Sequence, residues 1–500
     1  MELRQLLKDA DIQFPEYEGN CDISAIVSDS RNACKNCMFV CIRGLNRDGH
    51  QFAHDAVSAG AAVIVVEQNA ELDGFDTAVV ITVPNTRQAL AHLFNAWYGL
   101  PSEKMKFIAV TGTNGKTSVT YFLKRIFELA LYRCGLVGTV SCLSLNRRLI
   151  SDNEGKLRNM TTPDPEQLYG MLAQMVDDGV EYVFMEASSH ALALDKLSPI
   201  HFRAAIFTNL TQDHLDFHGS MKNYLSAKLK LLKKSELAIV NQDSPYYNDI
   251  KGSCAGKTVG CSIEADNADY RAVSIKNNGV DGIEYSVRSS NAMIKIRCMI
   301  PGNYTVMNTL EACACALELG IRPAVVAQAI ASISGIDGRL EKIKLGNDAD
   351  FSVFIDYAHT PDAMENLLRT ARAFCSEGQH IKILFGCGGD RDKSKRPVMG
   401  EIATRLADFA VITSDNCRCE PPDQIIKDIL EGVQGRDNYK VILSRKQAIE
   451  DIIFNADAGD VILLAGKGHE QYEINGDRRT PFSEKDIVLS AVKNRRNVNR

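Results

Sequence analysis

The feature that constrains the fold most is a glycine-rich loop between a short apolar strand and a helical stretch. The loop occupies residues 109–118 and reads Ala-Val-Thr-Gly-Thr-Asn-Gly-Lys-Thr-Ser. Gly112 and Gly115 allow backbone N–H groups to close around a phosphate. Lys116 adds a positive charge to such a site, and the Thr117 hydroxyl suits Mg²⁺. The pattern therefore predicts a phosphate-binding loop between a strand and a helix.

The loop is a shorter variant of the common phosphate-binding pattern, which has a glycine where this chain has Val110. Its pattern is Gly-x-x-Gly-Lys-Thr. The alternative interpretation is a glycine turn that contains a lysine by chance. Strand, loop and helix follow one another in the order that phosphate binding requires, which favours the first interpretation.

The length of the chain predicts three α/β domains. Its 500 residues are too many for one core, and roughly 150 residues per domain gives about three. Pro101 marks the first boundary and Gly335 the second. The predicted domains are residues 1–101, 102–335 and 336–500.

Strands alternate with helices in both larger domains, which predicts parallel sheets with crossover helices. Residues 270–300 differ, because they alternate like an antiparallel appendage around Asn277-Asn278-Gly279. The N-terminal domain has one clear buried strand and an amphipathic helix at residues 87–98. The expected strands are residues 61–66, 106–111, 182–187, 204–209, 237–241, 352–356, 381–385, 409–413 and 460–465.

Composition and charge exclude several classes of protein. Hydrophobic residues make up 45% and charged residues 24%, which is an ordinary globular balance. No apolar run approaches the roughly 20 residues of a membrane helix, and we expect no secretory signal. The net charge of −6 argues against a nucleic-acid binder that works by bulk charge. Fifteen cysteines without an export signal predict reduced thiols in the cytoplasm.

Two strand ends bring candidate metal ligands to the edge of the sheet that carries the phosphate loop. Glu186 ends one predicted strand, and His214 follows the next. Ligands of open α/β sheets bind at the carboxyl ends of strands, so this carboxylate and imidazole could hold Mg²⁺ beside nucleotide phosphates. The alternative is a set of helix caps and solvated histidines, and the residues alone do not decide between the two. Lys228 by itself reads as a solvated helix lysine.

Together these motifs resemble those of the Mur ligases over essentially the whole chain. Beside the phosphate loop, the resemblance rests on Met-Glu-Ala-Ser-Ser-His at 185–190, Asn-Leu-Thr-Gln-Asp-His-Leu-Asp-Phe-His at 209–218, Ala-Lys at 227–228, Gly-Asn-Tyr-Thr-Val-Met-Asn at 302–308, Gly-Arg-Leu-Glu at 338–341, Asp-Tyr-Ala-His-Thr-Pro-Asp-Ala at 356–363, Gly-Cys-Gly-Gly-Asp-Arg-Asp-Lys at 386–393, Gly-Lys-Gly-His-Glu at 466–470, Asp-Ser-Arg at 29–31 and Asp-Gly-His at 48–50.

The resemblance implies an N-terminal domain for the UDP end of a substrate, a central ATPase and a C-terminal Rossmann-like domain. It implies ATP- and Mg²⁺-dependent amide formation by a cytoplasmic monomer in peptidoglycan precursor synthesis. The D-Glu carboxylate of UDP-N-acetylmuramoyl-L-Ala-D-Glu would attack the γ-phosphoryl group of ATP and become an acyl phosphate. The amine of an incoming amino acid would then displace phosphate, with cations cancelling the charge repulsion.

The resemblance also assigns roles to matching positions of this sequence. Catalysis falls to Lys116, Glu186, His214 and Lys228, and Lys228 is expected to be carbamylated. The expected metal ligands are Thr117, Glu186, His214 and Lys228. The expected ATP-binding residues are Gly112, Thr113, Asn114, Gly115, Lys116, Thr117, Ser118, Asn303, Asn308 and Arg339. The expected contacts to the UDP substrate are Ser30, Thr161, Thr162, Ser188 and Lys196, where family members often have arginine in place of Lys196.

The resemblance places a further strand end of the C-terminal domain near the nucleotide, with Asp356, Tyr357 and His359. The two sheets would then rotate toward each other when ligands bind. Residues 335–338 contain two glycines and are the expected hinge.

The incoming amino acid is predicted from residues 415–418, Asp-Asn-Cys-Arg. Family members that add diaminopimelate have Asp-Asn-Pro-Arg, and those that add lysine typically lack the arginine. Arg418 offers a planar set of donors to the distal carboxylate of diaminopimelate, which lysine does not have. Cys417 in place of proline gives the loop more freedom without removing the charge. The expected amino-acid contacts are Arg391, Asp415, Asn416, Arg418, Gly466 and Glu470.

Several alternatives stay open at this point. The same ligase could use L-lysine or another amino acid, with Arg418 a solvated loop residue, and the stereoisomer is not fixed. A folylpolyglutamate-synthase-like ligase shares the phosphate loop, and a nucleotide-switched binding module would keep the loop without catalysis. Cys34 and Cys37 form a single Cys-x-x-Cys pair, which is a weak indication of zinc.

Overall fold

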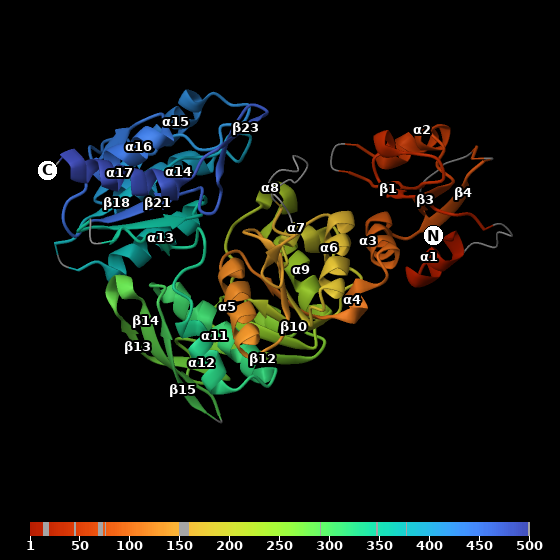
Figure 1. The fold of residues 1–500 in the computed structure, drawn as a ribbon, viewed down its shortest axis with the longest axis horizontal. Coiled ribbons are helices and arrows are strands. Elements are labelled where there is room, and N and C mark those ends of the chain that lie inside the picture. Colours follow the sequence, from red (N-terminus) through yellow and green to blue (C-terminus); the bar gives the residue numbers. More distant parts are fainter. Residues whose placement is uncertain are drawn as a thin grey trace.

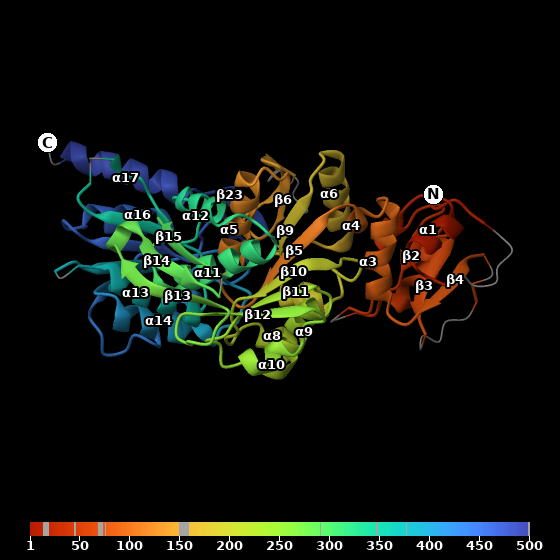
Figure 2. The same ribbon diagram turned by 90° about the horizontal axis from the view of Figure 1, so that it is seen from below.

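The computed structural model consists of three α/β bodies, each with its own main sheet. Figures 1 and 2 show the N-terminal body at one end of the long axis and the C-terminal body at the other. Within the residues described, no helix is long and apolar enough to cross a membrane. The structure describes residues 1–13, 20–44, 47–68, 74–75, 77–149, 160–290, 292–346, 349–376 and 378–498.

The N-terminal body is a parallel sheet of four strands in the order β1 (Ile26–Val27), β2 (Met38–Val40), β3 (Val63–Glu67) and β4 (Val79–Val83). Its helical elements are α1 (Leu3–Asp9), η1 (Ser30–Asn32), η2 (Gly49–Phe52), α2 (Ala53–Ser58) and α3 (Thr86–Trp97). Valine and isoleucine fill β3, which suits a strand covered on both faces. Asn85 caps α3 by accepting hydrogen bonds from two backbone N–H groups. The predicted strand and helix of this domain are confirmed to within two residues.

The central body holds an eleven-stranded sheet. Its order is β15 (Met293–Cys298), β14 (Ile283–Arg288), β13 (Tyr270–Asn277), β12 (Lys257–Ser262), β11 (Leu237–Asn241), β10 (Phe202–Phe207), β5 (Lys106–Thr111), β9 (Tyr182–Glu186), β6 (Cys134–Val137), β7 (Cys142–Ser144) and β8 (Arg147–Arg148). The strands from β12 to β6 in this order are parallel, as predicted. Strands β13 to β15 form the predicted antiparallel appendage, whereas the antiparallel extension β7–β8 is not in the sequence prediction.

Helices cover both faces of the central sheet, because side chains alternate along its strands. On β5, Ile108 and Val110 pack toward α5 (Lys116–Leu129), α11 (Asn303–Glu318) and α12 (Pro323–Ala331). Phe107 and Ala109 pack on the other face, in one core that continues into α3 of the N-terminal body. The other helices of the central body are α4 (Pro101–Lys104), α6 (Pro165–Asp177), α7 (Ser189–Ala193), α8 (Leu215–His218), α9 (Met221–Lys233), α10 (Tyr247–Lys251) and η3 (Gly279–Asp281).

The C-terminal body is a six-stranded sheet in the order β16 (Glu341–Lys342), β17 (Ser352–Asp356), β21 (Val461–Ala465), β18 (Ile381–Phe385), β19 (Phe409–Ile412) and β20 (Tyr439–Val441). All its pairs are parallel except β16–β17, and four of the strands were predicted. The remaining elements are the hairpin β22 (Tyr472–Asn475) and β23 (Arg478–Pro481), with helices α13 (Pro361–Phe374), α14 (Lys395–Leu406), α15 (Pro422–Leu430), α16 (Arg445–Phe454) and α17 (Glu484–Val498).

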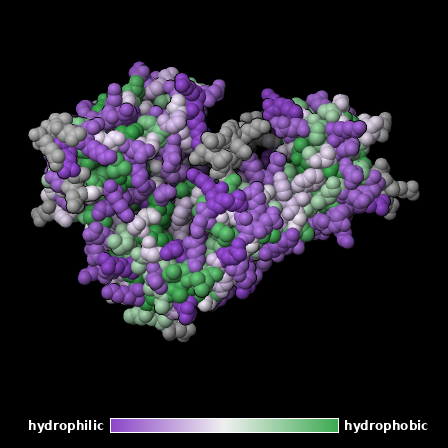
Figure 3. All heavy atoms as spheres, viewed as in Figure 1, coloured by the Kyte–Doolittle hydropathy of each residue, from purple (hydrophilic) through white to green (hydrophobic). Residues whose placement is uncertain are grey.

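Each main sheet lies within one predicted range, and we propose residues 1–101, 102–335 and 336–500 as the three domains. Figure 3 shows a largely polar face that is hollowed between the N-terminal and C-terminal bodies. The appendage also touches the C-terminal body, where the Asn277 amide donates a hydrogen bond to the carbonyl oxygen of Ala373 in α13.

Candidate functional site

The phosphate loop follows β5 and leads into α5, as the sequence predicts. Two of its glycines cannot be replaced without strain. Gly112 has φ +141°, and a Cβ there would lie 2.0 Å from Thr208 Oγ1. Gly115 caps α5 at φ +87°, and a Cβ there would lie 2.5 Å from Asn308 Oδ1. The backbone can therefore close into a tight cradle only with glycine at both places.

Lys116 folds back over this cradle. Its ammonium group donates hydrogen bonds to the carbonyl oxygen atoms of Gly112 at 3.0 Å and Thr113 at 2.8 Å. Burial lowers the pKa of Lys116, and the nearby Glu186 carboxylate opposes that shift. A positive charge held at the mouth of the loop suits an anionic group there.

Oxygen donors gather at the edge of the loop around Glu186. Its Oε1 accepts hydrogen bonds from the Thr117 hydroxyl at 3.0 Å and the Thr139 N–H at 2.9 Å. The Thr139 hydroxyl lies 2.9 Å from the other carboxylate oxygen. Arg339 reaches across from the C-terminal domain and donates to the Thr117 hydroxyl at 3.2 Å. Four side chains from both domains thus meet at one point.

His214 and Lys228 lie on either side of the loop. His214 has φ +53° and its ring centroid lies 4.7 Å from that of His190, while burial lowers its pKa. Lys228 is only 1% exposed and donates a hydrogen bond to the Gly112 carbonyl oxygen at 2.8 Å. Burial, and then the charge of Lys116, hold the pKa of Lys228 well below its ordinary value. The sequence reading of Lys228 as a solvated lysine is therefore wrong.

A cavity of about 470 Å³, the loop cavity, opens over the phosphate loop between the central and C-terminal domains. Of the predicted ATP-binding residues, Asn303 and Gly112 do not line it. The predicted lining residues are Thr113, Asn114, Gly115, Lys116, Thr117, Ser118, Asn308 and Arg339, and Glu186, His214, Asp356, Tyr357 and His359 line it as well.

Sequence reasoning missed other walls of the loop cavity, including Tyr304, Thr305, Asp362 and Asn366. The spacing of Tyr304 and Asn308 is the signal that could have found the first of these. Residues four apart share one face of a helix, so a lining Asn308 on α11 implies a lining residue at 304.

The loop is tied to the C-terminal domain through Asp362, at the start of α13. Its Oδ2 accepts hydrogen bonds from the Asn114 amide at 2.8 Å and from the Thr211 hydroxyl at 3.1 Å. Two segments of the central domain thus meet one carboxylate of the C-terminal domain. A movement of the phosphate loop can therefore be transmitted directly to α13 through these hydrogen bonds.

The predicted amino-acid contacts form a hydrogen-bonded group beside β21 and β22. The Asn416 amide donates to Glu470 Oε2 at 2.7 Å, and Asn416 Oδ1 accepts from the Lys467 ammonium at 3.0 Å. Burial raises the pKa of Glu470, and the charge of Asp415 adds to the effect. Gly466 has φ +113°, and a Cβ there would lie 2.7 Å from Asp415 Oδ2. The structure therefore brings these residues together.

Arg418 is the most constrained residue of this loop. It adopts φ +51°, and its backbone N–H donates to Ile474 in β22 at 3.2 Å. Its guanidinium donates to the Gly389 carbonyl oxygen at 2.8 Å, and a Cβ on Gly388 would lie 2.9 Å from the same nitrogen. A Cβ on Gly388 would also lie 3.9 Å from Arg391 Cγ, and the pKa of Arg391 is lowered by desolvation and then by the charge of Arg418. Two guanidinium groups thus lie close enough to repel one another.

Cys417 does not loosen this loop in the way expected from the loss of proline. Its side chain is buried, and the thiol contacts the Asp415 carbonyl oxygen at 3.3 Å. A Cβ on Gly389 would lie 1.9 Å from the Cys417 carbonyl oxygen, so a neighbouring strand end packs directly on the loop. Tight packing fixes the loop where proline would have stiffened it.

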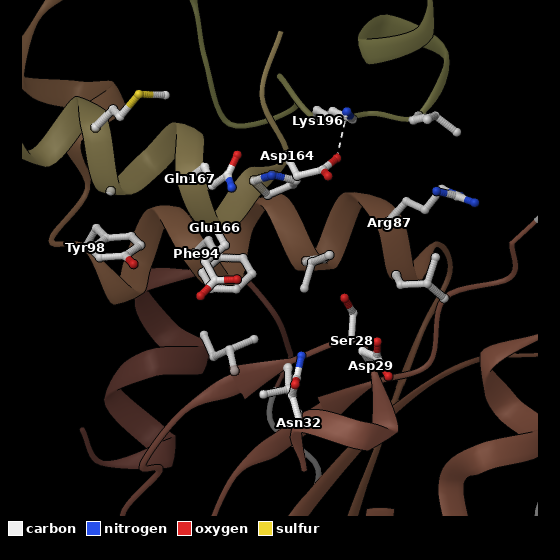
Figure 4. A pocket seen from close by; sticks show the side chains of 18 of the residues that line it. Ser28, Asp29, Asn32, Arg87, Phe94, Tyr98, Asp164, Glu166, Gln167 and Lys196 are labelled. Atoms are coloured by element: carbon white, nitrogen blue, oxygen red, sulfur yellow. Dashed lines mark ion pairs between the residues drawn. The ribbon is translucent and has the colours of Figure 1, made fainter. Parts of the chain in front are cut away.

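A cavity of about 990 Å³, the first cavity, lies between the N-terminal and central domains. Figure 4 shows Phe94 and Tyr98 on one helix to the left, Ser28 and Asp29 at the lower right, and Lys196 and Asp164 above them. Ser30 is not among its lining residues, although Asp29 and Asn32 on either side of it are. This cavity is larger than the loop cavity and combines aromatic with polar side chains.

Lys196 reaches into the first cavity but carries an ion pair. Its ammonium lies 2.8 Å from Asp164 Oδ1, as the dashed line in Figure 4 marks. Thr162 lies beside Glu186 instead, because its hydroxyl donates to the Glu186 carbonyl oxygen at 2.8 Å and lies 3.2 Å from Ser188 Oγ. The Thr161 hydroxyl accepts from Thr139 at 3.0 Å. These predicted substrate contacts therefore lie next to the predicted catalytic carboxylate.

The Cys-x-x-Cys pair lies in a locally packed turn of the N-terminal domain. Cys37 is buried, and its sulfur accepts a hydrogen bond from the Cys34 N–H at 3.3 Å. Across the part of the chain that the structure describes, no group of three or more His, Cys, Asp or Glu residues is arranged to hold a metal ion. The pair is thus explained by local packing in the N-terminal domain.

Three family models match the chain in succession. The catalytic-domain model of the Mur ligase family matches residues 22–98, the Mur ligase middle domain matches residues 110–316, and the Mur ligase glutamate ligase domain matches residues 338–468. Together they account for more than half of the chain.

Relatives of known name match over the full length. A protein of Clostridium tetani (strain Massachusetts / E88) named UDP-N-acetylmuramoyl-L-alanyl-D-glutamate–2,6-diaminopimelate ligase is 40% identical, covering 98% of this chain and 99% of its own. A protein of the same name from Clostridioides difficile (strain 630) is also 40% identical, with coverage of 98% and 99%. A solved structure with that name has a TM-score of 0.68 at 27% identity, covering 98% and 99%. These matches show that the chain belongs to the Mur ligase family.

Proposed function

We propose that the chain is an ATP-dependent amide ligase that joins 2,6-diaminopimelate to the D-Glu carboxylate of UDP-N-acetylmuramoyl-L-Ala-D-Glu. The observation that carries the choice of amino acid is the pair Arg391 and Arg418, two neighbouring guanidinium groups. A carboxylate between them would relieve their repulsion and accept planar donors from Arg418. The nearby Glu470 carboxylate would receive the distal amine. The named relatives carry the same activity in their names.

The first chemical step is the attack of the D-Glu carboxylate on the γ-phosphoryl group of ATP. Two anions repel, so this step needs fixed positive charge along the path of the transferred group. Lys116 supplies such charge in the mouth of the loop, and Arg339 supplies it beside Thr117. The acyl phosphate that results has a good leaving group for attack by an amine.

Mg²⁺ fits the residues at the edge of the loop. The Thr117 hydroxyl and the Glu186 carboxylate are oxygen donors 3.0 Å apart, which is the ligand type that Mg²⁺ prefers. Gly138 keeps room beside them, because a Cβ there would lie 2.4 Å from Glu186 Oε1. We propose Thr117, Glu186, His214 and a modified Lys228 as the residues that would hold it. When bound, Mg²⁺ would neutralise charge that develops on the phosphates.

We propose that Lys228 carries a carbamate. Carbamylation needs an uncharged amine, and burial together with Lys116 favours the uncharged form of Lys228. A carbamate would also replace a second cation next to Lys116 with an anion suited to a metal ion. The hydrogen bond from the Lys228 amine to the Gly112 carbonyl oxygen supports this proposal, because it holds the amine against the phosphate loop.

We propose the first cavity as the site for the UDP-muramoyl part of the substrate. Its aromatic wall, Phe94 and Tyr98, suits a flat base, and Arg87 suits an anion. Ser30, Thr161, Thr162, Ser188 and Lys196 are proposed contacts along this side. The ion pair with Asp164 means that Lys196 would exchange one carboxylate for another when substrate binds.

The direct test measures phosphate release from ATP by the purified chain. Release should require both UDP-N-acetylmuramoyl-L-Ala-D-Glu and an amino acid, and the product mass should equal that of the tripeptide. Phosphate release that ignores both additions would indicate a nucleotide-switched module instead. Release that depends on a folate and glutamate would indicate the folylpolyglutamate-synthase-like alternative.

A further inference from the structure

The two cavities described above are joined by a third. This middle cavity of about 570 Å³ lies between the central domain and the C-terminal hairpin β22–β23. Gln167 lines both the first and the middle cavity. Thr139 and His469 line both the middle and the loop cavity. Within the described residues the three cavities therefore form a series from the N-terminal domain to the phosphate loop.

This order fixes where the reaction takes place, given the proposed function on which this inference rests. A sugar-peptide in the first cavity must pass Gln167 to bring its carboxylate to ATP in the loop cavity. The activated carbonyl then lies at the junction of the middle and loop cavities. Glu470, the proposed contact for the amino acid, lines the middle cavity as well. The amine therefore meets the acyl phosphate beside Thr139 and His469.

Of these two junction residues, only His469 can exchange a proton near neutral pH. The Thr139 hydroxyl is engaged with Glu186 at 2.9 Å and Thr161 at 3.0 Å. His469 Nδ1 is buried and has no hydrogen-bond partner in the described part of the chain. A buried polar atom without a partner is uncommon and calls for an explanation, of which a catalytic role is one.

The backbone holds His469 at the junction by close packing. Gly338 has φ +66°, and a Cβ there would lie 2.2 Å from the His469 backbone nitrogen. Gly468 has φ +53°, and a Cβ there would lie 2.7 Å from the Cβ of Tyr357. The Tyr357 ring then packs against the imidazole, with centroids 5.2 Å apart. Because these two glycines have no side chain, the loop of His469 can pack closely against the hinge and against the end of β17.

The charges that face His469 keep it uncharged. Burial lowers its pKa to about 4, and Arg339 from the hinge and Arg148 from β8 act in the same direction. Tyr357 is the titratable group packed on the ring, and Glu470 is its neighbour in the chain. Phosphates that enter the loop cavity would add negative charge and raise the pKa of His469 toward neutrality. The imidazole is then an acceptor that is free to take a proton.

We propose that His469 accepts a proton from the amine of the incoming amino acid during its attack on the acyl phosphate. The amine arrives as an ammonium ion and must lose two protons to become an amide nitrogen. The nitrogen forms a bond to the carbonyl carbon, and the bond from that carbon to the phosphate oxygen breaks with its electron pair. One proton passes to His469 and then to solvent, and the other leaves on the released hydrogen phosphate.

The other histidines of the site fit this role less well. His359 lines only the loop cavity, and its Nδ1 lies 2.8 Å from the Tyr357 carbonyl oxygen. His214 also lines only the loop cavity and lies 3.3 Å from Asp213. In the described structure, His469 is the histidine that faces both the nucleotide side and the amino-acid side.

The test separates acyl-phosphate formation from amine attack. Hydroxylamine is uncharged near neutral pH and traps acyl phosphates as hydroxamates, so it needs no proton acceptor. In H469A and H469Q, diaminopimelate addition should fall about 10²-fold, the usual contribution of a general base, while hydroxamate formation stays within about twofold. The acidic limb of the pH profile for diaminopimelate addition should also change. The exposed His201, which lines none of the three cavities, gives the control H201N.

Two outcomes would overturn the proposal. Parallel loss of hydroxamate and tripeptide in both variants would mean that His469 only supports the structure. Unchanged diaminopimelate addition in H469Q would mean that another group takes the proton. Absence of any tripeptide with the unaltered chain would instead contradict the proposed function, so the two failures can be told apart.

Discussion

At the scale of single residues, Glu311 stands out as a buried carboxyl group without a visible role. It lies in α11, is fully buried, and neither carboxylate oxygen has a hydrogen-bond partner among the described residues. Burial raises the pKa of Glu311 well above its ordinary value. The folded state therefore binds this proton more tightly than the unfolded state. The contribution of this bound proton to the free energy of unfolding is complete below the pKa of Glu311 in the unfolded chain, about 4.3. It is lost as the pH rises through the pKa of Glu311 in the folded protein.

We expect E311L to stabilise the protein, and more so at pH 8 than at pH 4. Removing a buried polar group without a partner is worth about 1–3 kcal/mol. Urea unfolding at both pH values measures the change in free energy of unfolding. The neutral variant E311Q is the matched control and should reduce the pH dependence without the gain in apolar burial. Equal stability changes at the two pH values would contradict an uncharged Glu311.

Of the single residues in the proposed mechanism, we expect Lys116 to have the largest effect on turnover. K116A should lower turnover by at least about 10²-fold, because it removes fixed charge from the transferred phosphoryl group. Steady-state phosphate release measures this loss. The exposed Lys233 on α9 gives the matched control K233A, which should keep its activity. If K116A turned over at nearly the rate of the unaltered chain, the proposed role of the phosphate loop in catalysis would be wrong.

At the scale of elements, α9 carries Lys228 on the face that packs against the phosphate loop, where its side chain is buried. Because Lys228 is proposed to act as a carbamate, K228A should lose activity and regain part of it with short carboxylic acids. The variant K230A, which changes a lysine about half a turn further along the same helix, should keep its activity without added carboxylic acid. A lysine that stays unmodified in the presence of bicarbonate, ATP and Mg²⁺ would contradict this proposal, and ¹³C-labelled bicarbonate followed by NMR shows which form is present.

Some helices and strands could be predicted from the sequence and others could not. The strand, loop and helix around Gly112 and Gly115 could be predicted because no other residue fits those backbone angles. The hairpin β22–β23 and the extension β7–β8 could not, because strands of two to four residues carry too little periodicity.

Within the site, the chemistry of a residue was easier to predict than its surroundings. Arg418 was predicted from its charge, whereas its positive φ and its bond to Gly389 depend on a strand distant in sequence. The burial of Lys228 likewise follows from packing against the loop rather than from its own helix. Asn303 stays a prediction as an ATP contact, and it does not line the loop cavity, whereas its neighbours Tyr304 and Thr305 do.

At the scale of the whole molecule, the proposed reaction draws on all three domains. Asn114 and Thr211 already hold Asp362 of the C-terminal domain, so ligand binding at the loop can move that domain as a unit. We expect an ATP analogue and the UDP substrate together to reduce the radius of gyration in small-angle scattering. D362A should weaken this response, because it removes both hydrogen bonds. Identical scattering curves with and without ligands would contradict closure.

The choice of amino acid also belongs to the whole molecule, because the proposed reaction must bring the loop of Arg418 together with the nucleotide and the UDP substrate. A site built around a charged partner rejects an analogue that lacks it by around 10⁴-fold. R418A should erase most of this preference, and R418K, which keeps the charge without the planar fork, should keep part of it.

The most direct test offers diaminopimelate and L-lysine together, with ATP and UDP-N-acetylmuramoyl-L-Ala-D-Glu, and identifies the product by mass. We expect the diaminopimelate tripeptide, with a preference of at least about 10²-fold in kcat/KM. Equal or greater formation of the lysine tripeptide by the unaltered chain would contradict the assignment of Arg418 and, with it, the proposed substrate.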